Sequence, residues 1–513
     1  MASKFILKIT SAALVIVMML AMFAACAETQ DGSGETTLAP ETQAPSAATT
    51  VAETEPEETI VGDDVPELDF KGEEIIILGR NRDWVADEII VSDENGTVVN
   101  DAVYKRNSLV TERLGINLTF QGVGSTNTTD NYAVRDALRK FIESGEEDID
   151  LVSNAAYVAA STQAEGLYRN LTDVENLDLS KPYWSQGLNT AMEAGGAQYL
   201  CSGAIFLSYY RFIFATFFNV DMFNNAGIEL LYDTVEKGEW TLEKQFTLAE
   251  QLYKDNNGNG ETDEGDFFGF MGNHDMIGVD GYWASFELPI LTKDEEGYYK
   301  YALDLERTGK AVSLINDFFW NNKGVMRVAH KSGDTEQDDI AQSFANEEAA
   351  MVTLRLYECE NDLVGMSNYG IVPLPKLDGN QEINRSAIHD SFSVYSLPNF
   401  SFTDDELSML GAVLEVMASQ SFKTITPAYY EQALKGRYVN DPQSVAMLDD
   451  ITQNVWIEAG ILNCNAIEAP HKTFRDAIKN KYPNASSLFS QKEKVTLKKV
   501  KDLNESLKKL IGG

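Results

Sequence analysis

The sequence is poor in the residues that metal, redox and nucleic-acid chemistry require. Only 4 histidines and 4 cysteines occur among 513 residues, which argues against a zinc enzyme and against a disulfide scaffold. Bases are scarce as well, because 41 Lys and Arg stand against 80 Asp and Glu, for a formal net charge of −39. A chain this acidic is expected to repel phosphate backbones and anionic membrane surfaces, which excludes nucleic-acid binding as a main role.

Signatures of hydrolytic and nucleotide chemistry are missing too. The sequence has no G-x-S-x-G, H-E-x-x-H or P-loop pattern. Its histidines, at positions 274, 330, 389 and 471, are too scattered to suggest a site. A glycosidase needs only two suitably placed carboxylates, so a secreted carbohydrate-active hydrolase stays an alternative to a binding protein.

One uncharged apolar segment lies at the N-terminus. Lys4 and Lys8 precede the stretch from Ala12 to Ala25, which is shorter than a typical membrane span and ends in small residues. This pattern predicts a signal peptide over residues 1–25, with an uncleaved N-terminal anchor as the alternative. The tetrapeptide Phe23-Ala24-Ala25-Cys26 resembles a bacterial lipobox, which implies acylation of Cys26 and a protein outside the membrane that contacts it through this lipid anchor only.

The next segment has the composition of a tether. Between Ala27 and Asp69 there are twelve acids and no Lys or Arg, and most other residues are Thr, Ala, Pro and Ser. Residues 26–69 are therefore predicted to be extended and solvated. The three remaining cysteines, an odd and widely spaced set, are predicted to be buried thiols rather than a bridge: Cys201, Cys359 and Cys464.

Hydrophobic patterning in the body predicts an α/β fold. Strands are expected at 73–79, 116–120 and 148–153, with helices at 100–113 and 134–144 between them, and Arg80–Trp84 as a loop. Ala204–Val220 is expected to form buried strands, because Arg211 lies inside this apolar run. Further helices are expected after the cap Thr241 (244–253), over 404–419 and over 492–510.

Four stretches carry a resemblance to the family 1 extracellular solute-binding lipoproteins of bacterial ABC importers of the carbohydrate type. They are Phe214–Phe223, Trp240–Leu242 followed by Asp255–Asp266, Tyr369–Lys376 and Thr426–Asp450.

The resemblance implies an α/β, two-lobed periplasmic-binding-protein-like (type II) fold with crossover hinge strands. Lobe one would comprise residues 70–207 and 391–425, and lobe two 208–390 and 426–513. A monomeric receptor would capture a sugar or oligosaccharide by hinge closure and deliver it to ABC transporter permease subunits at the extracellular face of the cell membrane. A peptide-binding or adhesin surface lipoprotein is the further alternative.

A loop of oxygen-bearing residues predicts a structural Ca²⁺ site. Asp255–Asp266 places oxygen side chains at positions 1, 3, 5 and 9 and glycine at position 6, as calcium loops do, although position 12 is Asp rather than Glu. An Asn-Gly turn without an ion is the alternative. By resemblance to relatives with a shorter loop, the ligands would be Asp255, Asn257, Asn259, Glu261 through its carbonyl, Asp263 and Glu264.

Ligand-binding candidates are aromatic, amide and charged residues near expected strand ends and crossings. Sugar sites combine flat apolar rings with a few polar groups, and ligands of α/β sheets lie at the carboxyl ends of the strands. The predicted set, part of which rests on the resemblance, is Trp84, Asn154, Tyr157, Tyr209, Tyr210, Arg211, Tyr282, Trp283, Arg355, Tyr357, His389, Asp390 and Trp456.

Overall fold

The computed structural model describes residues 62–125, 131–263, 265–331, 335–366, 368–439, 441–468 and 470–512. The chain divides into two compact units, Met1–Thr59 and Ile60–Gly513, and all described residues belong to the second. The predicted signal peptide, Cys26 and the tether up to residue 61 therefore lie outside the described residues. None of the helices in the described ranges is long and apolar enough to cross a bilayer.

The last residues of the predicted tether are packed rather than solvated. Asp63 and Val65 are buried, and both oxygens of Asp63 accept hydrogen bonds of 2.7 Å from the Arg113 guanidinium. The packed part of the chain thus begins before Phe70, which corrects the predicted boundary.

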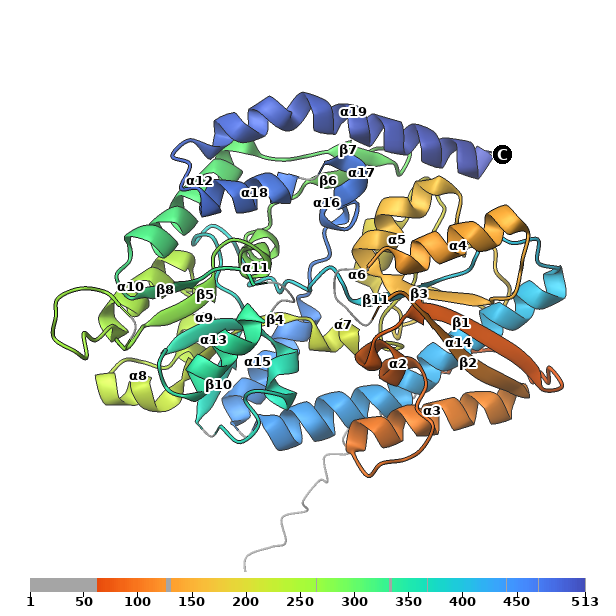
Figure 1. Ribbon diagram of the computed structural model, residues 1–513, viewed down its shortest axis with the longest axis horizontal. Helices are drawn as coiled ribbons and strands as arrows, with labels where there is room; N and C mark the ends of the chain where they lie inside the picture. The colour runs from red at the N-terminus through yellow and green to blue at the C-terminus, as the bar shows by residue number, and fades with distance from the viewer. Residues whose placement is uncertain are drawn as a thin grey trace, which may run out of the picture. The chain divides into compact units, whose positions relative to one another are not determined.

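The first sheet has the strand order β11-β3-β1-β2 (Figure 1). β1 (Glu73–Arg80) pairs in parallel with β2 (Ile116–Val123) and β3 (Leu151–Ala155), and β11 (Ser393–Ser396) joins β3 in antiparallel fashion. The three strands predicted in this region are confirmed.

Helices alternate with these strands, as predicted. α3 (Val98–Leu114) ends at Gly115, whose left-handed backbone (φ 62°) suits glycine. The expected loop at Arg80–Trp84 is wrong in its second half, because α2 (Asp83–Ile89) begins three residues after β1. The other helical elements of this half are α4 (Ala133–Ser144), α5 (Ala156–Thr162), η1 (Gln163–Glu165) and α6 (Gln186–Met192).

The second sheet has the order β10-β4-β9-β5-β8. β5 (Phe270–Asn273) is parallel to β8 (Val325–Val328) and to β9 (Met351–Arg355). β4 (Phe214–Asn219) runs antiparallel to both β9 and β10 (Tyr369–Val372).

Short helices and a hairpin complete the second half. The predicted cap is confirmed, since the Thr241 side chain accepts from the Lys244 N–H at the start of α10 (Leu242–Leu252). The other elements are α8 (Val220–Ala226), α9 (Leu231–Glu236), α11 (Ile277–Ser285), β6 (Leu291–Lys293), β7 (Tyr299–Tyr301), α12 (Leu305–Asn316), η2 (Asp317–Asn321), α13 (Glu336–Ala345) and η3 (Leu356–Glu360).

The chain passes between the two sheets three times. It leaves β3 for β4 through α7 (Ser208–Arg211), returns from β10 to β11, and leaves again along α14 (Asp404–Thr426) into η4 (Pro427–Tyr438) and α15 (Pro442–Gln453). The expectation of strands throughout Ala204–Val220 is wrong, because only β4 is a strand there. An apolar run shows that a segment is buried but leaves its local structure open.

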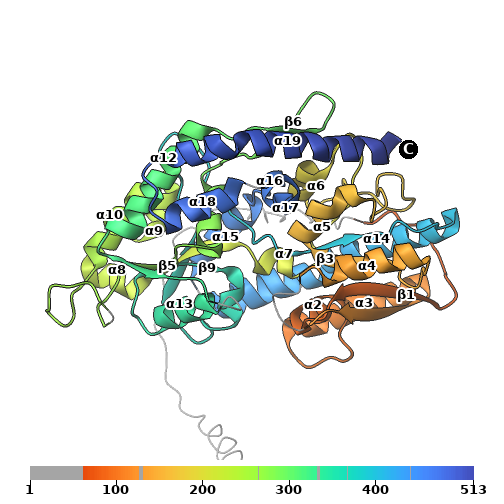
Figure 2. The same cartoon turned by 45° about the horizontal axis from the view of Figure 1, so that its top comes forward.

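The C-terminal segment contacts both halves (Figures 1 and 2). α16 (Ala459–Leu462) and α17 (Cys464–Ile467) pack against α5. α19 (Ala485–Gly512) packs against α12, α18 (Pro470–Lys479) and η1. It begins earlier than predicted.

The predicted apolar stripe of the terminal helix packs onto the body, as expected. Val500, Leu503 and Leu507 are buried, although Leu510 is 37% exposed. The buried thiols are also confirmed, because the cysteines at 201, 359 and 464 are all free and buried.

Candidate functional site

Strand ends of the two sheets lead into one region. β1 leads into α2, and β9 leads into η3, while α7 connects the halves. One cavity lies in this region. Its lining includes Trp84 of α2, Tyr357 of η3, and Leu207 and Arg211 from the connecting segment. Because ligands of α/β sheets lie at strand ends, this cavity is the first candidate site.

The cavity has a volume of about 550 Å³, within the range of about 300–1,000 Å³ for small-molecule sites. Its walls come from residues 83–103 of the first half, from the connection, and from residues 357–364 of the second half. Neither half therefore forms it alone. Three predicted ligand residues lie in it, together with polar residues that were not predicted: Asp83, Asp87, Asn95, Asn100, Glu360 and Asn361.

Trp84 is held in position by two neighbours. The guanidinium carbon of Arg80 lies 4.9 Å from its ring centroid, and the Phe212 ring meets it edge-on at 5.2 Å. The row of rings continues from Phe212 to His389 (5.7 Å) and from His389 to Phe214 (6.3 Å). Trp84 itself is half-buried, so it presents a rigid apolar surface to the cavity.

Arg211 is paired rather than free to meet an anion. Its Nε and Nη2 donate to the two oxygens of Glu360 at 2.6 and 2.8 Å, and the two side chains are 15% and 11% exposed. Although burial lowers the pKa of Arg211, Glu360 more than compensates, so the guanidinium stays charged. Asp83 and Asp87 then leave the cavity acidic. Burial raises the pKa of Asp87, and the neighbouring Asp83 raises it further.

His389, Asp390 and Trp456 line a second, smaller cavity of about 30 Å³, beside Phe214. The Ser391 N–H donates to Nδ1 of His389 (3.1 Å), and burial lowers the pKa of this histidine to about 3, so its ring is neutral. Burial raises the pKa of Asp390 to about 6. These three predicted residues are therefore brought together, at the far end of the row of rings.

Arg355 lies between the cavities. Its guanidinium carbon is 5.5 Å from the Phe212 ring centroid and 5.9 Å from that of Tyr357. Nη2 donates to Oε1 of Glu358 at 2.9 Å. The orientation of Arg355 is therefore fixed by a carboxylate behind it.

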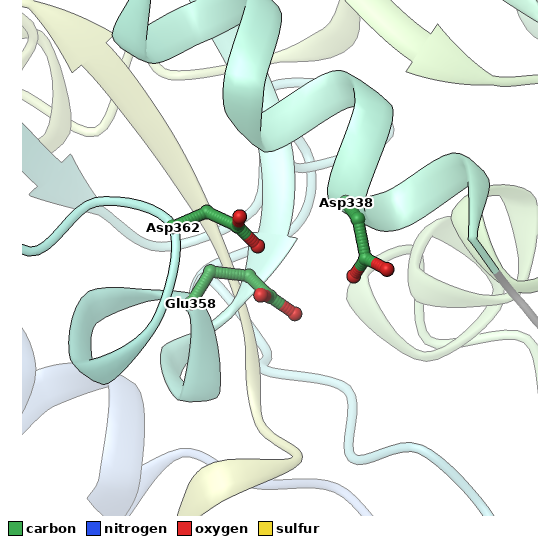
Figure 3. A group of neighbouring side chains, drawn as sticks. All are labelled: Asp338, Glu358 and Asp362. Carbon is green, nitrogen blue, oxygen red and sulfur yellow. The ribbon is translucent and has the colours of Figure 1, made fainter.

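Glu358 also belongs to a group of three carboxylates (Figure 3). Its oxygens and those of Asp338 and Asp362 include atoms that all lie within 4.8 Å of one another. Burial raises the pKa of Glu358, the neighbouring Asp338 and Asp362 raise it further, and Arg355 opposes this shift. We interpret these three carboxylates as the groups that hold the Arg355 guanidinium in position.

Two predicted ligand residues lie in the core instead. Tyr282 and Trp283 are fully buried on α11, where the Trp283 ring packs against Phe474 (4.9 Å) and the Tyr282 hydroxyl donates to Gln245. Their assignment to the cleft is wrong, because they lie on a helix that packs into the core.

The remaining predicted residues lie outside both cavity linings. Asn154 is fully buried within β3, which contradicts its prediction as a ligand residue. Tyr157 is half-buried next to the smaller cavity, where its N–H donates to the Asp390 carbonyl. Tyr209 and Tyr210 are half-buried at the crossing, with hydroxyl groups bonded to Ser185 and Thr426.

The predicted calcium loop folds around one carboxylate. Asn257 and Asn259 donate from their amide nitrogens to the two oxygens of Asp263, at 2.8 and 2.6 Å. The Asp255 carboxylate accepts from two loop N–H groups. The Asn257 and Asn259 amide oxygens accept from the N–H groups of Asn259 and Glu261. The loop thus gathers amide and carboxylate oxygens, a donor set that suits Ca²⁺. Glu261 lies in the same exposed loop, and Glu264 lies outside the described residues.

Sequence reasoning missed the residues that join the site together. Phe212 and Phe214 belong to the row of rings and lie one and three residues after the predicted Arg211, so their position was the available signal. Arg80 lies at the end of β1, and this strand-end position does predict a place near the pocket, although Arg80 was not among the predicted ligand residues. The pairing of Arg211 with Glu360 had no signal in the sequence.

Two α/β halves, three passages of the chain between them and a cavity walled by both define the type II periplasmic-binding-protein-like fold. Solved structures share it at low sequence identity. The galacto-N-biose/lacto-N-biose I-binding protein of an ABC transporter from Bifidobacterium longum, solved with lacto-N-biose, is 14% identical, with a TM-score of 0.52 over 85% of this chain and 98% of that one.

The GacH receptor of Streptomyces glaucescens, solved unliganded and with acarbose, is 13% identical, with a TM-score of 0.50 over 86% of this chain and 98% of that one. Searches of protein-family models and of curated proteins match nothing. The likeness therefore shows the fold.

Proposed function

We propose that this protein is an extracytoplasmic receptor that captures a sugar or oligosaccharide and presents it, unaltered, to the permease of an ABC importer. One observation carries the proposal: a cavity of about 550 Å³ whose walls come from both halves, with Trp84 on one side and Tyr357 on the other. Half-buried rings and amide side chains suit the apolar faces and hydroxyl groups of sugars. The two solved structures named above, which bind saccharide ligands, support this class of solute.

The proposed mechanism is closure of the halves on the ligand. A ligand that contacts both walls binds the closed arrangement better than an open one and so shifts the population toward it. The three passages between the sheets would absorb the change in backbone angles. The receptor acts as a monomer, and no covalent step is part of this function.

The proposed location is the outer face of the cell membrane, with Cys26 acylated as the anchor. The composition of residues 1–69 supports this part of the proposal. Metabolic labelling with a radioactive fatty acid tests it, since the label should enter the wild-type protein and be lost in Cys26→Ala.

A thermal-shift screen against mono- and oligosaccharides tests the proposed function. A ligand that binds only the folded state raises the melting temperature by mass action. We expect at least one saccharide to do so, and we expect it to be recovered unchanged after long incubation. Release of products would show a hydrolase instead. A panel that leaves the melting temperature unchanged, with peptides stabilising the protein, would refute the sugar assignment.

A further inference from the structure

The C-terminal helix α19 has a charge opposite to that of the rest of the body. It contains seven lysines and three acids, a net charge of +4, in a chain with 80 acids and 41 bases. All seven lysines are exposed. The buried face of the helix, which includes Val500, Leu503 and Leu507, packs on the body. The positive charge therefore lies on the side that faces solvent.

Four of the lysines share the outer side of the helix. Lys494, Lys498, Lys501 and Lys509 follow one another at intervals of four, three and eight residues, which a helix of 3.6 residues per turn places along one face. We call these four residues the lysine face. It extends for about 22 Å at 1.5 Å per residue.

Few acids neutralise this face. Lys501 has Glu505 at 3.6 Å, and Lys508, to one side, is paired with Glu296 at 2.8 Å. Among the residues that the structure describes, Lys494, Lys498 and Lys509 have no ion pair within 4 Å. At physiological ionic strength the screening length is about 8 Å, so a surface that touches the helix responds to these lysines more than to distant acids.

The lysine face lies on a helix packed against the body and has apolar neighbours. α19 runs along one edge of the described body in Figures 1 and 2, and it packs on α12 and α17. Val495 and Leu497 flank the lysines and are 44% and 48% exposed. Lysines beside exposed apolar side chains are typical of helices that bind a charged lipid interface, where both kinds of residue contribute.

We propose that the lysine face of α19 binds the headgroups of an anionic phospholipid bilayer. The interaction is separate from solute binding, because no residue of α19 lines either of the two cavities described above. It would orient the body on the membrane, with the side carrying α19 toward the lipid.

Co-sedimentation with vesicles tests this proposal. The body Ile60–Gly513, a compact unit without Cys26, is mixed with vesicles of phosphatidylcholine alone or of phosphatidylcholine with phosphatidylglycerol. We expect binding only when phosphatidylglycerol is present, and weaker binding when the ionic strength rises from about 0.15 M to about 1 M, where the screening length falls to about 3 Å. The triple variant Lys494→Glu, Lys498→Glu, Lys501→Glu should reduce the partition coefficient at least ~10-fold.

A charge-matched variant is the control. Lys105→Glu, Lys140→Glu, Lys323→Glu changes the net charge equally, away from α19, and should bind like the wild type. Equal melting temperatures for both variants and the wild type establish that each is folded. The proposal is overturned if the wild-type body does not bind vesicles with phosphatidylglycerol or binds vesicles of phosphatidylcholine alone equally well. It is also overturned if the control variant loses as much binding as the triple variant in α19.

Discussion

Replacing Trp84 by alanine probes the proposed site most directly. The half-buried indole lines the cavity of about 550 Å³ and contacts Arg80 and Phe212. Its removal takes away apolar surface that a sugar ring would cover. Burial of a large apolar side chain is worth about 1.5–3 kcal/mol, so we expect a loss of about 2 kcal/mol in binding and a Kd about 30-fold higher.

The same change also weakens the fold, and the two effects have to be separated. Trp84→Ala leaves space beside Phe212 and removes the cation–π partner of Arg80. Because Trp84 is only half-buried, we expect a loss of about 2 kcal/mol in unfolding free energy, below the 3–5 kcal/mol typical of a fully buried aromatic residue. Trp84→Phe keeps a ring and should recover part of both quantities.

Isothermal titration calorimetry with a saccharide from the thermal-shift screen measures the binding term. Trp320→Ala is the matched control. This indole is also half-buried and stacked by cations, Arg327 and Lys481, but it lines neither of the two cavities. It should lower stability similarly and leave Kd unchanged. A Kd for Trp84→Ala within twofold of the wild-type value would refute the placement of the solute against Trp84.

Three further results are expected. Burial raises the pKa of Glu458 to about 7, so its ionisation opposes folding. Relative to Glu458→Gln, urea titrations should show the wild type losing about 3 kcal/mol of unfolding free energy as pH rises from about 4.5 through 7, and a pH-independent difference would contradict this. Adding a chelator should lower the melting temperature, and added Ca²⁺ should restore it. Asp263→Ala should abolish both effects. A wild-type melting temperature that does not respond to the chelator would show that the loop is a turn without an ion. Glu360→Gln should destabilise the protein by ~2 kcal/mol or more in the same titrations, because it leaves the buried Arg211 charge without its partner, and an unchanged midpoint would disprove that.

The order of strands and helices in the first half could be predicted because each element has its own local signal. The apolar run predicts β1, and the glycine after α3 predicts its end, from only a few neighbouring residues each. Trp84 was expected in a loop and lies on α2, yet it still faces the cavity. A residue close to the carboxyl end of a strand lies near the site whether it belongs to a loop or to a short helix.

The failure at Tyr282 and Trp283 has a long-range cause. Both residues follow a glycine-rich stretch, Gly269–Gly281, and glycines of this stretch allow close packing of α11. A Cβ at Gly278 would lie 2.6 Å from the Asn273 carbonyl oxygen, and one at Gly281 would lie 3.2 Å from Leu374. Glycine permits both a loop and a close contact, and only the neighbouring chain segment decides between them.

A long-range contact also decides the charge of the site. Arg211 was predicted at the crossing between the halves, and it is there, but its Nε and Nη2 both donate to Glu360, 149 residues further along. The cavity also presents two carboxylates, Asp83 and Asp87, beside Trp84, and burial raises the pKa of Asp87 while Arg211 opposes this shift. Carboxylates can accept hydrogen bonds from hydroxyl groups, and an excess of them over cations would repel an anionic solute. Under the proposed function, this charge balance favours neutral, hydroxyl-rich solutes over anions, a distinction that the positions of the residues in the sequence could not supply.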